Sequence, residues 1–250
     1  MLFDQVRINK YLSASGYCSR READRILEEG RVTVDGKTAG VGDRVGPGQT
    51  VCVDGTKIHN NTERIVIAFH KPSGVVCTSS KKDKDNIIDF LQFDERIYPV
   101  GRLDKDSTGL ILLTNDGELT DRILRGRNGH EKEYEVTVDK PLKREVIRAM
   151  EQGVPILGTM TKPCRIQKLD DRRFRMILTQ GLNRQIRRMC EYFGCRVLTL
   201  KRVRIMNIEL GSLPEGEWRY LTREELRELE KSMKGQKFYN DRAAADERID

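Results

Sequence analysis

Residues 101–115 read GRLDKDSTGLILLTN and combine a charged loop with a strongly apolar segment. The apolar part, 109–115, is too hydrophobic to face water on either side, so we expect a strand buried within a β-sheet. The loop before it contains two carboxylates, two cations, two hydroxyls and two glycines. Loops supported by a rigid sheet are where catalytic groups concentrate, although a surface loop in which Asp104 or Asp106 caps a turn explains this composition equally well.

Strand and helix patterns continue on both sides of this stretch, from residue 64 onwards. The strand patterns lie at 65–69, 133–138 and 173–180, and the helix patterns at 118–125, 143–152 and 183–193. Strands outnumber helices without regular alternation, so we predict an α+β fold with a mixed, mainly antiparallel sheet and flanking helices. Thr222–Glu225 match the capping box of a last helix. Residues 235–250 have alternating charges and few apolar side chains, which predicts a disordered tail.

The first 55 residues have the pattern of a separate, small α/β unit. Ser19–Glu22 read SRRE, a capping box for a short helix, and Asp35-Gly36 is a strong signal for a β-hairpin. Residues 56–63 are polar and aperiodic, as expected of a linker. We therefore predict domains at 1–55 and 64–234.

The charge balance favours a polyanionic partner. Lysine and arginine number 46 and aspartate and glutamate 39, which gives a formal net charge of +7. Such a balance suits nucleic acid or an anionic membrane surface. The chain has no apolar run of about 18 residues and starts without the apolar segment of a signal peptide, so we expect a cytoplasmic protein that binds nucleic acid.

Other classes of chemistry have little support in the sequence. The six cysteines form no Cys-x-x-Cys pair and the three histidines lie far from any ligand cluster, so we expect no metal site and reduced cysteines. Phosphate-binding, dinucleotide-binding and Ser/His/Asp motifs are missing from the sequence, so ATP use, hydride transfer and serine hydrolysis are not indicated.

Basic residues gather in two parts of the sequence. On the N-terminal helices they are Arg7, Lys10, Arg20, Arg21 and Arg25. Near the start of a later helix they are Arg184, Arg187 and Arg188. Arginines at a helix start oppose the helix dipole, which suggests that they bind an anion outside the helix. Solvated helix surface is the alternative at both places. Two single residues are further candidates. Tyr134 lies in a predicted strand, where a tyrosine is most often part of the core. Lys71 precedes a predicted tight turn, where it is equally well explained as a solvated side chain.

The N-terminal stretch NKYLSASGYCSRREADRILEEGRVTVDG (9–36) resembles the S4 RNA-binding domain. Further along, KPSGVV, VGRLDKDSTGLILLTNDG, KEYEV and GLNRQIRRM follow one another as the ordered motifs of the pseudouridine synthases do. The resemblance is to the RsuA-type branch, whose members carry an N-terminal S4 domain, and it extends from residue 5 to about residue 230.

The resemblance implies an enzyme that isomerises uridine in RNA without a cofactor or metal. It assigns the essential carboxylate to Asp104, the tyrosine that stacks on the base and acts as general base to Tyr134, and the cation paired with the aspartate to Arg187. It also implies that Arg102 enters the RNA stack when the uridine leaves. Whether the carboxylate attacks C1′ or takes a proton from C2′ stays open.

The same resemblance implies RNA contacts along both domains. The expected contacts are Arg7, Lys10, Arg20, Arg21, Arg25, Lys71, Arg102, Arg184 and Arg188. Longer segments such as RGRNGHEKEYEVTVDKP and LTQGLNRQIRRMCEYFG resemble the corresponding segments of family members that act on the large ribosomal subunit. That likeness implies a 23S rRNA stem-loop as substrate, with the anticodon region of tyrosine tRNA as a second one and a monomer as the default state.

Two alternatives to the enzyme remain at this point. A catalytically inactive, S4-domain ribosome-assembly factor would bind the same RNA, but it would have no need of Asp104, Tyr134 and Arg187 together. A transcriptional regulator that places its N-terminal arginines on DNA would leave about three-quarters of the chain unexplained.

Overall fold

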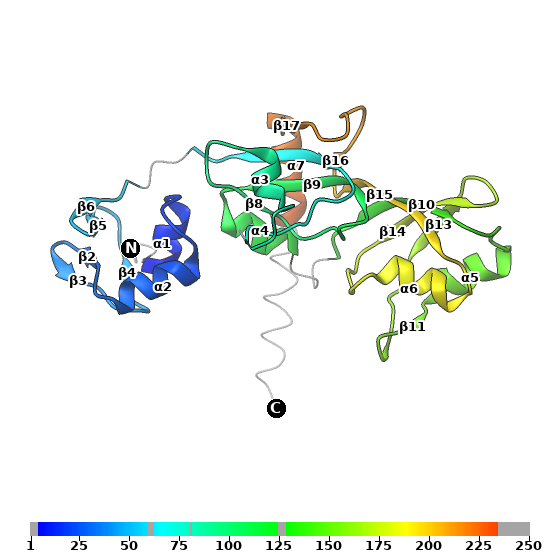
Figure 1. Cartoon of the computed structure of the whole chain (residues 1–250), viewed down its shortest axis with the longest axis horizontal. Helices are drawn as coiled ribbons and strands as arrows, with labels where there is room; N and C mark the ends of the chain where they lie inside the picture. Colours follow the sequence, from blue (N-terminus) through cyan, green and yellow to red (C-terminus); the bar gives the residue numbers. More distant parts are fainter. Residues whose placement is uncertain (1–4, 60–62, 81, 125–128, 235–250) are drawn as a thin grey trace. The chain divides into compact units, whose positions relative to one another are not determined.

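The computed structural model describes residues 5–59, 63–80, 82–124 and 129–234, and it divides into two compact units (Figure 1). The first unit consists of Met1–Ile65 with the short segments Phe93–Arg96 and Asn115–Gly117, and the second unit contains the remainder. The tail predicted to be disordered, 235–250, lies outside the described residues. In the described part of the chain, none of the helices has the length and apolarity that crossing a lipid bilayer requires.

The first unit packs two helices against short strands. Its helices are α1 (Ile8–Ala14) and α2 (Arg20–Glu28), and β1 (Val6–Arg7) pairs with β4 (Arg44–Val45). A four-stranded sheet follows the order β3 (Lys37–Thr38), β2 (Val32–Val34), β5 (Val51–Val53) and β6 (Thr56–Lys57). Buried side chains from both helices and from the sheet form one core, which contains Ile8, Leu12, Ala23, Ile26, Leu27, Val32, Val51 and Val53.

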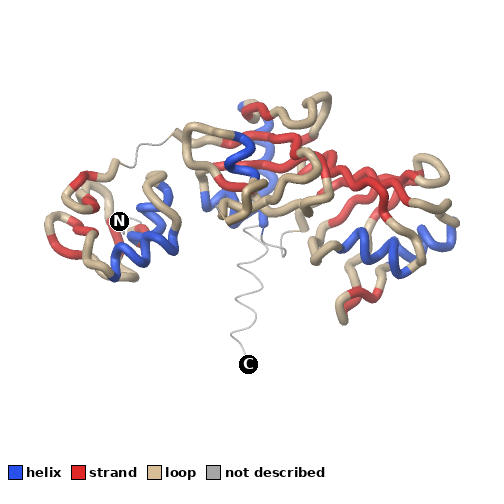
Figure 2. The backbone as a smooth tube through the Cα atoms, viewed as in Figure 1, coloured by secondary structure: helices blue, strands red, loops and turns tan. Residues whose placement is uncertain are grey.

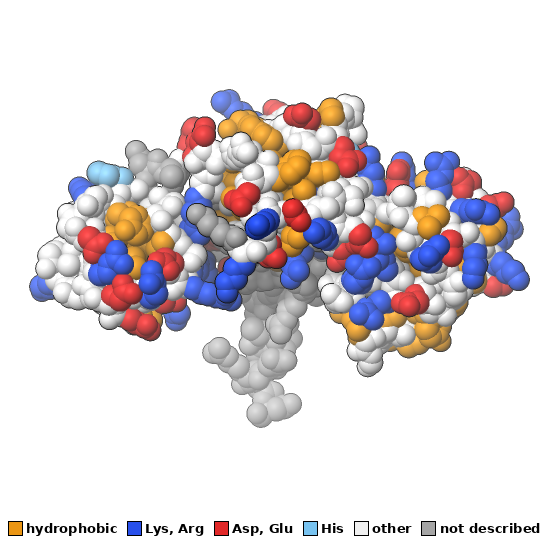
Figure 3. All heavy atoms as spheres, in the orientation of Figure 1, with side chains coloured by type: hydrophobic (Ala, Val, Ile, Leu, Met, Phe, Trp, Pro, Cys, Tyr) orange, Lys and Arg blue, Asp and Glu red, His pale blue; other side chains and the backbone are white. Residues whose placement is uncertain are grey.

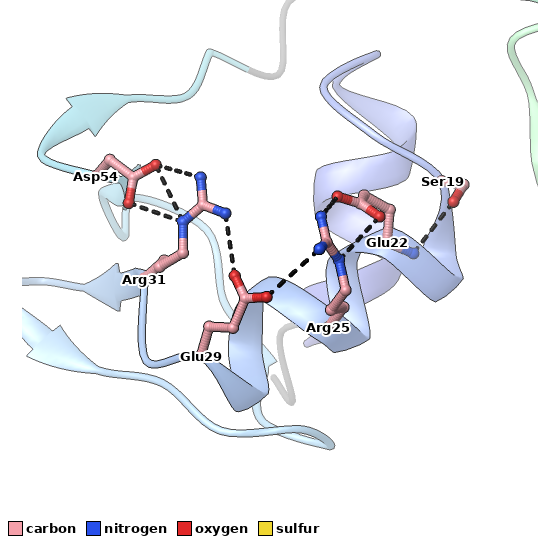
Figure 4. Close-up of polar contacts among 6 residues, drawn as sticks. All are labelled: Ser19, Glu22, Arg25, Glu29, Arg31 and Asp54. Atoms are coloured by element: carbon pink, nitrogen blue, oxygen red, sulfur yellow. Dashed lines mark hydrogen bonds and ion pairs between the residues drawn. The ribbon is translucent and has the colours of Figure 1, made fainter.

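The predicted capping box at the start of α2 is confirmed in its first half. The Ser19 hydroxyl accepts a hydrogen bond from the Glu22 backbone N–H at 3.1 Å. The Glu22 carboxylate is bound to Arg25, which also pairs with Glu29 at 3.5 Å (Figure 4). Glu29 is in turn 3.0 Å from Arg31. The charge of Arg25 is therefore balanced by two carboxylates, one in the first turn of α2 and one at its C-cap.

Part of the predicted linker is a strand. Asp54 and Gly55 both have positive φ, +49° and +78°, and they turn the chain back so that β6 pairs with β5. The earlier Asp35-Gly36 turn has nearly the same φ angles, +49° and +78°, and connects β2 to β3. The prediction of a linker from residue 56 missed this second Asp-Gly hairpin because β6 is only two residues long and polar. Residues 60–62 of the linker lie outside the described residues.

The second unit is built on a nine-stranded sheet, whose strands are drawn in red in Figure 2. The strand order is β13-β14-β10-β15-β9-β7-β17, with β16 paired to β15 and β8 paired to β9. Only the pairing between β15 and β9 is parallel among the pairs of described strands, so the mixed, mainly antiparallel α+β fold is confirmed. The strands are β7 (Val66–Lys71), β8 (Tyr98–Pro99), β9 (Thr108–Thr114), β10 (Lys132–Val138), β13 (Arg165–Lys168), β14 (Arg173–Leu178), β15 (Val197–Ile205), β16 (Ile208–Glu209) and β17 (Trp218–Tyr220).

Helices cover this sheet in two groups, each with its own core. The helices are α3 (Ile87–Leu91), α4 (Gly117–Leu124), α5 (Arg144–Gln152), α6 (Gln185–Tyr192) and α7 (Arg223–Lys234), and β11 (Pro155–Ile156) and β12 (Thr159–Met160) form a hairpin. One core lies under α5 and α6, and the other lies under α4 and α7. Strand β15 contributes Leu200 to the first core and Ile205 to the second. Residues 109–114 of the predicted apolar strand are buried as expected, because β9 lies between β15 and β7.

The parallel pairing between β9 and β15 requires a glycine. Gly109 has a φ of +106°, and a Cβ placed there would lie 2.2 Å from the carbonyl oxygen of Arg202. Such an approach is far inside van der Waals contact, and the other near atoms also belong to the Arg202 backbone, which cannot rotate away. The charged loop therefore enters its buried strand through a position that tolerates no side chain.

We expect Gly109→Ala to lower the free energy of unfolding by roughly 3 kcal/mol, because it adds backbone strain and separates two strands. Chemical denaturation of the full chain measures this. Gly181→Ala is the matched control, since Gly181 has no positive φ and a Cβ there would meet nothing within 4 Å. Equal stability of the two variants would contradict the assignment.

Candidate functional site

A cavity of about 670 Å³ opens in the second unit. Its walls come from the loop between β8 and β9, from strands β10, β14 and β15, and from the segment that leads into α6. Asp104, Tyr134 and Arg184 line it together although they are far apart in the sequence. The fold thus brings three of the predicted site residues to one place, and Arg102 also lines this cavity.

Asp104 lies in the loop that precedes β9, with about a third of its side chain exposed. Its backbone carbonyl accepts a hydrogen bond from the Ser107 N–H at 3.1 Å, which closes a tight turn. One carboxylate oxygen lies 3.6 Å from a terminal nitrogen of Arg184. The carboxylate is thus open to the cavity on one side and next to a cation on the other.

Arg184 binds both carboxylates of the loop. Its guanidinium is 3.2 Å from the nearer Asp106 oxygen and 3.6 Å from Asp104. It is the N-cap of α6 and has a left-handed backbone, with φ of +49°, which is costly for a residue with a Cβ. An arginine in this strained position, at a helix end that disfavours cations, is consistent with a role outside the helix.

Arg187 takes a different place from the one expected. Its Nη2 donates to the Asp106 carbonyl and to the Ser107 hydroxyl, both at 3.2 Å, and Nη1 donates to the Val197 carbonyl at 3.3 Å. Within the described part of the chain, the ion-pair partner of Asp104 is Arg184 and that of Arg187 is Asp106. Arg187 lies one turn into α6, so it reaches the base of the loop and β15 instead of the Asp104 carboxylate.

The two arginines keep Asp106 charged. Partial burial raises the pKa of this carboxyl, but the hydrogen bond from Arg184 and the positive charges of Arg187 and Arg184 lower it more. The net result is a pKa below the usual value for an aspartate. Asp106 therefore stays ionised and fixes both arginines beside the loop.

Lys71, which was expected to contact RNA, is completely buried behind the loop. Its ammonium donates hydrogen bonds to the carbonyls of Pro72 at 2.8 Å, Val75 at 2.9 Å and Lys105 at 3.4 Å. Burial lowers the pKa of Lys71, while nearby Cys77 and Asp106 oppose this shift. With its donors committed to backbone carbonyls and no surface exposed, this lysine supports the loop and does not meet RNA in this conformation.

Arg202 holds the loop from the sheet side. It is 2% exposed, and its guanidinium donates to the Leu110 carbonyl at 2.7 Å and to the Arg102 carbonyl at 3.5 Å. Nearby, the Leu103 N–H donates to the sulfur of Cys77 at 3.3 Å. Sequence reasoning missed Arg202. The sequence offered only a weak signal, because Lys201 and Arg204 of β15 are basic as well and Arg202 does not stand out from them.

Tyr134 lies on β10 between Met176 of β14 and Arg202 of β15, which are its cross-strand neighbours. It packs against the core under α5 and α6 and also lines the cavity, so one part of the ring is buried and another is accessible. The interpretation of Tyr134 as a core tyrosine therefore accounts for only the buried part of its ring.

The remaining basic candidates have varied surroundings. Arg102 is exposed at the cavity, whereas Arg188 folds back to donate to the Asn183 carbonyl at 3.1 Å. In the first unit, Arg7, Arg20 and Arg21 are exposed. Among the described residues, no group of three or more His, Cys, Asp or Glu side chains is placed to hold a metal ion.

Two family models match the chain. Residues 65–192 match the model described as RNA pseudouridylate synthase, and residues 6–58 match that of the S4 domain. A crystal structure of a pseudouridylate synthase superposes with a TM-score of 0.66 and 29% sequence identity, covering 90% of this chain and 99% of that one.

Curated relatives agree with these matches. The dual-specificity RNA pseudouridine synthase RluF of Salmonella typhi is 55% identical over 94% of this chain and 82% of its own length. The RluF protein of Escherichia coli strain K12 is also 55% identical, over 90% of this chain and 78% of its own length. These relatives are named as enzymes, so the alternative of an inactive assembly factor is not supported. From its S4 segment to its synthase segment, this chain belongs to the RNA pseudouridine synthases.

Proposed function

We propose that this pseudouridine synthase converts a uridine in a 23S rRNA stem-loop, and a second one in tyrosine tRNA, with Asp104 as its catalytic carboxylate. The observation that carries the proposal is the placement of Asp104 next to Arg184, in a cavity shared with Tyr134. Support for two substrates comes from relatives, 55% identical, that are described as dual-specificity enzymes. The cytoplasm, where both RNAs are found, is the proposed location.

The uridine has to leave the RNA stack before it can reach Asp104. Flipping a base out costs a few kcal/mol, which contacts in the pocket and along the backbone must offset. Tyr134 offers an aromatic face inside the cavity for the flipped base. Arg102 is exposed where the cavity meets the surface, so it is placed to occupy the space that the base leaves.

The reaction breaks the bond between N1 of uracil and C1′ of ribose, and it later joins C5 to C1′. An ionised Asp104 either attacks C1′ or removes the proton from C2′, and the two routes need the same carboxylate in the same place. The proton on C5 is finally removed and N1 ends protonated, for which Tyr134 is the proposed base. Atoms and electrons are conserved, so the product is an isomer.

RNA binding is proposed to use the first unit as well as the cavity rim. Acidic and basic side chains are interspersed on the face drawn in Figure 3, so the net charge of +7 does not form a single basic field there. Arg20 and Arg21 are exposed and have no ion-pair partner among the described residues, unlike Arg25. We therefore assign phosphate contacts to Arg20 and Arg21 before Arg25.

Replacing Asp104 by asparagine should remove the charge but keep the shape, so we expect the rate of pseudouridine formation to fall by roughly 100- to 10,000-fold. The measurement is pseudouridine mapping of a transcribed 23S stem-loop and tyrosine tRNA after incubation with each protein. Asp139→Asn, at a surface ion pair with Arg196, is the control. Near-normal rates for the Asp104 variant would remove this residue from the chemistry.

The two arginines of α6 should differ in what their loss changes. Arg187→Met should destabilise the fold by about 1–3 kcal/mol, because it leaves buried partners unpaired, and should also slow the reaction. Arg184→Met should slow the reaction with a smaller loss of stability, since 42% of its side chain is exposed to solvent, against 13% for Arg187. Denaturation curves and single-turnover rates on the same samples separate the two effects. Equal stability of both variants would contradict the assignment of Arg187 to the loop backbone.

Removing two unpaired charges should weaken RNA binding in a salt-dependent way. For the Arg20→Gln/Arg21→Gln double variant, we expect the slope of log K against log salt to decrease by about 0.7–0.9 for each phosphate that the protein no longer neutralises. Arg25→Gln is the matched control on the same helix, and it should change the slope little because Glu22 and Glu29 already balance this arginine. A larger effect of Arg25→Gln than of the double variant would reverse the assignment.

A further inference from the structure

Lys132 lies at the start of β10, two residues before Tyr134 on the same side of the strand, and both line the cavity. Its cross-strand neighbours are Leu178 on β14 and Ile205 on β15, each 2% exposed. These two apolar residues also line the cavity. Lys132 therefore presents a cation from an apolar part of the cavity wall, beside the tyrosine that is proposed to receive the base.

Within the part of the chain that the structure describes, nothing balances the charge of Lys132. Among the described residues, its ammonium has no hydrogen-bond or ion-pair partner. The adjacent carboxylates are already engaged, because Arg204 binds Glu131 at 3.1 Å and Glu133 at 2.9 Å. An unpaired cation in a partly apolar place is costly, so a negative group supplied by a ligand is the natural partner.

Burial and a neighbouring cation both act on this lysine. Burial lowers the pKa of Lys132, and the positive charge of Arg202 lowers it further. Arg202 itself has a terminal nitrogen, Nη2, that is buried without a hydrogen-bond partner in the described structure. The base of the cavity is thus electropositive, whereas Asp104 supplies negative charge nearer the loop.

The ligand group that fits this place is the base and not a phosphate. A phosphate carries a permanent, strongly hydrated charge, and the exposed Arg184 and Arg102 at the loop can meet it without burying it. Uracil has an apolar ring that suits Leu178 and Ile205, and it becomes negative only when its bond to ribose breaks. A cation that acts on charge appearing in the reaction favours the transition state over the bound substrate.

We propose that Lys132 donates a hydrogen bond to a carbonyl oxygen of the flipped uracil and stabilises the negative charge that the base carries after the N1–C1′ bond breaks. This role rests on the proposed function. The electron pair of that bond moves to N1 and spreads onto the O2 carbonyl, while C1′ bonds to Asp104 or C2′ loses a proton to it. Lys132 keeps its own protons, and the charge disappears when C5 bonds to C1′.

The test compares Lys132→Met, Lys132→Arg and Lys201→Met on the 23S stem-loop RNA, with the single-turnover rate and the RNA dissociation constant measured separately. Lys201 is the matched control, since it lies on the neighbouring strand β15, opposite Glu135, and does not line the cavity. We expect Lys132→Met to slow the single-turnover rate by about 100-fold, with a change in RNA affinity of less than about threefold. Lys132→Arg should recover at least about a tenth of the wild-type rate, because it retains a charged donor.

A second measurement distinguishes charge stabilisation from a structural role. Fluorine at C5 makes the uracil anion more stable by itself, so RNA with 5-fluorouridine at the target should need Lys132 less. We expect the loss caused by Lys132→Met, followed as cleavage of the N-glycosidic bond, to shrink to about tenfold on that RNA. A merely structural lysine would give the same loss on both RNAs.

Three outcomes would overturn the role of Lys132: an unchanged rate in Lys132→Met, a loss of RNA affinity without a loss of rate, or equal defects on the two RNAs. Each of these leaves the proposed function intact as long as wild type is active and Asp104→Asn is not. An active Asp104→Asn protein would instead overturn the proposed function, so the two failures are distinguishable.

Discussion

Strand β15 passes so close to Gly109 that its backbone occupies the volume of a side chain, and from the same residue of β15 the Arg202 guanidinium reaches both Arg102 and Leu110. The loop carrying Asp104 is therefore fixed at its two ends by one residue of the central strand. Arg202 and Gly109 also belong to the parallel pairing between β15 and β9. This pairing lies between the part of the sheet covered by α5 and α6 and the part covered by α4 and α7. The cavity is lined by residues from both parts.

Two buried cations and one that is largely buried bind the backbone of this loop. Lys71 donates to the Lys105 carbonyl, Arg187 to that of Asp106, and Arg202 to those of Arg102 and Leu110. A buried cation that loses its hydrogen-bond partners is costly. The loop therefore favours backbone conformations in which its carbonyls stay bonded to these side chains. The Asp104 carboxylate is left facing the cavity with Arg184 beside it. Cations therefore have two locations. Those behind the loop hold its backbone conformation, and we propose that those in the cavity act on RNA.

The same distinction between satisfied and unsatisfied charge applies in both units. Arg25 belongs to a chain of ion pairs that ends at Asp54, and such pairs at an exposed surface add little to stability. Arg20, Arg21 and Lys132 have no such partner among the described residues. Formal charge alone is therefore a poor guide to an RNA-binding surface, because a residue counts only after its neighbours in space have been considered.

Local patterns in the sequence were sufficient for the α+β class, the buried strand after the charged loop, the capping hydrogen bonds of Ser19 and Thr222, and the family, because each depends on residues close together in the chain. The capping hydrogen bonds, for example, join residues three positions apart. The tertiary structure alone decided that Lys71 is buried, that Arg184 pairs with Asp104 while Arg187 pairs with Asp106, and that Lys132 lines the cavity. Those outcomes depend on contacts between residues that are distant in the sequence, such as Asp106 and Arg184, which are 78 residues apart. No local pattern of side chains specifies that two such residues meet in space.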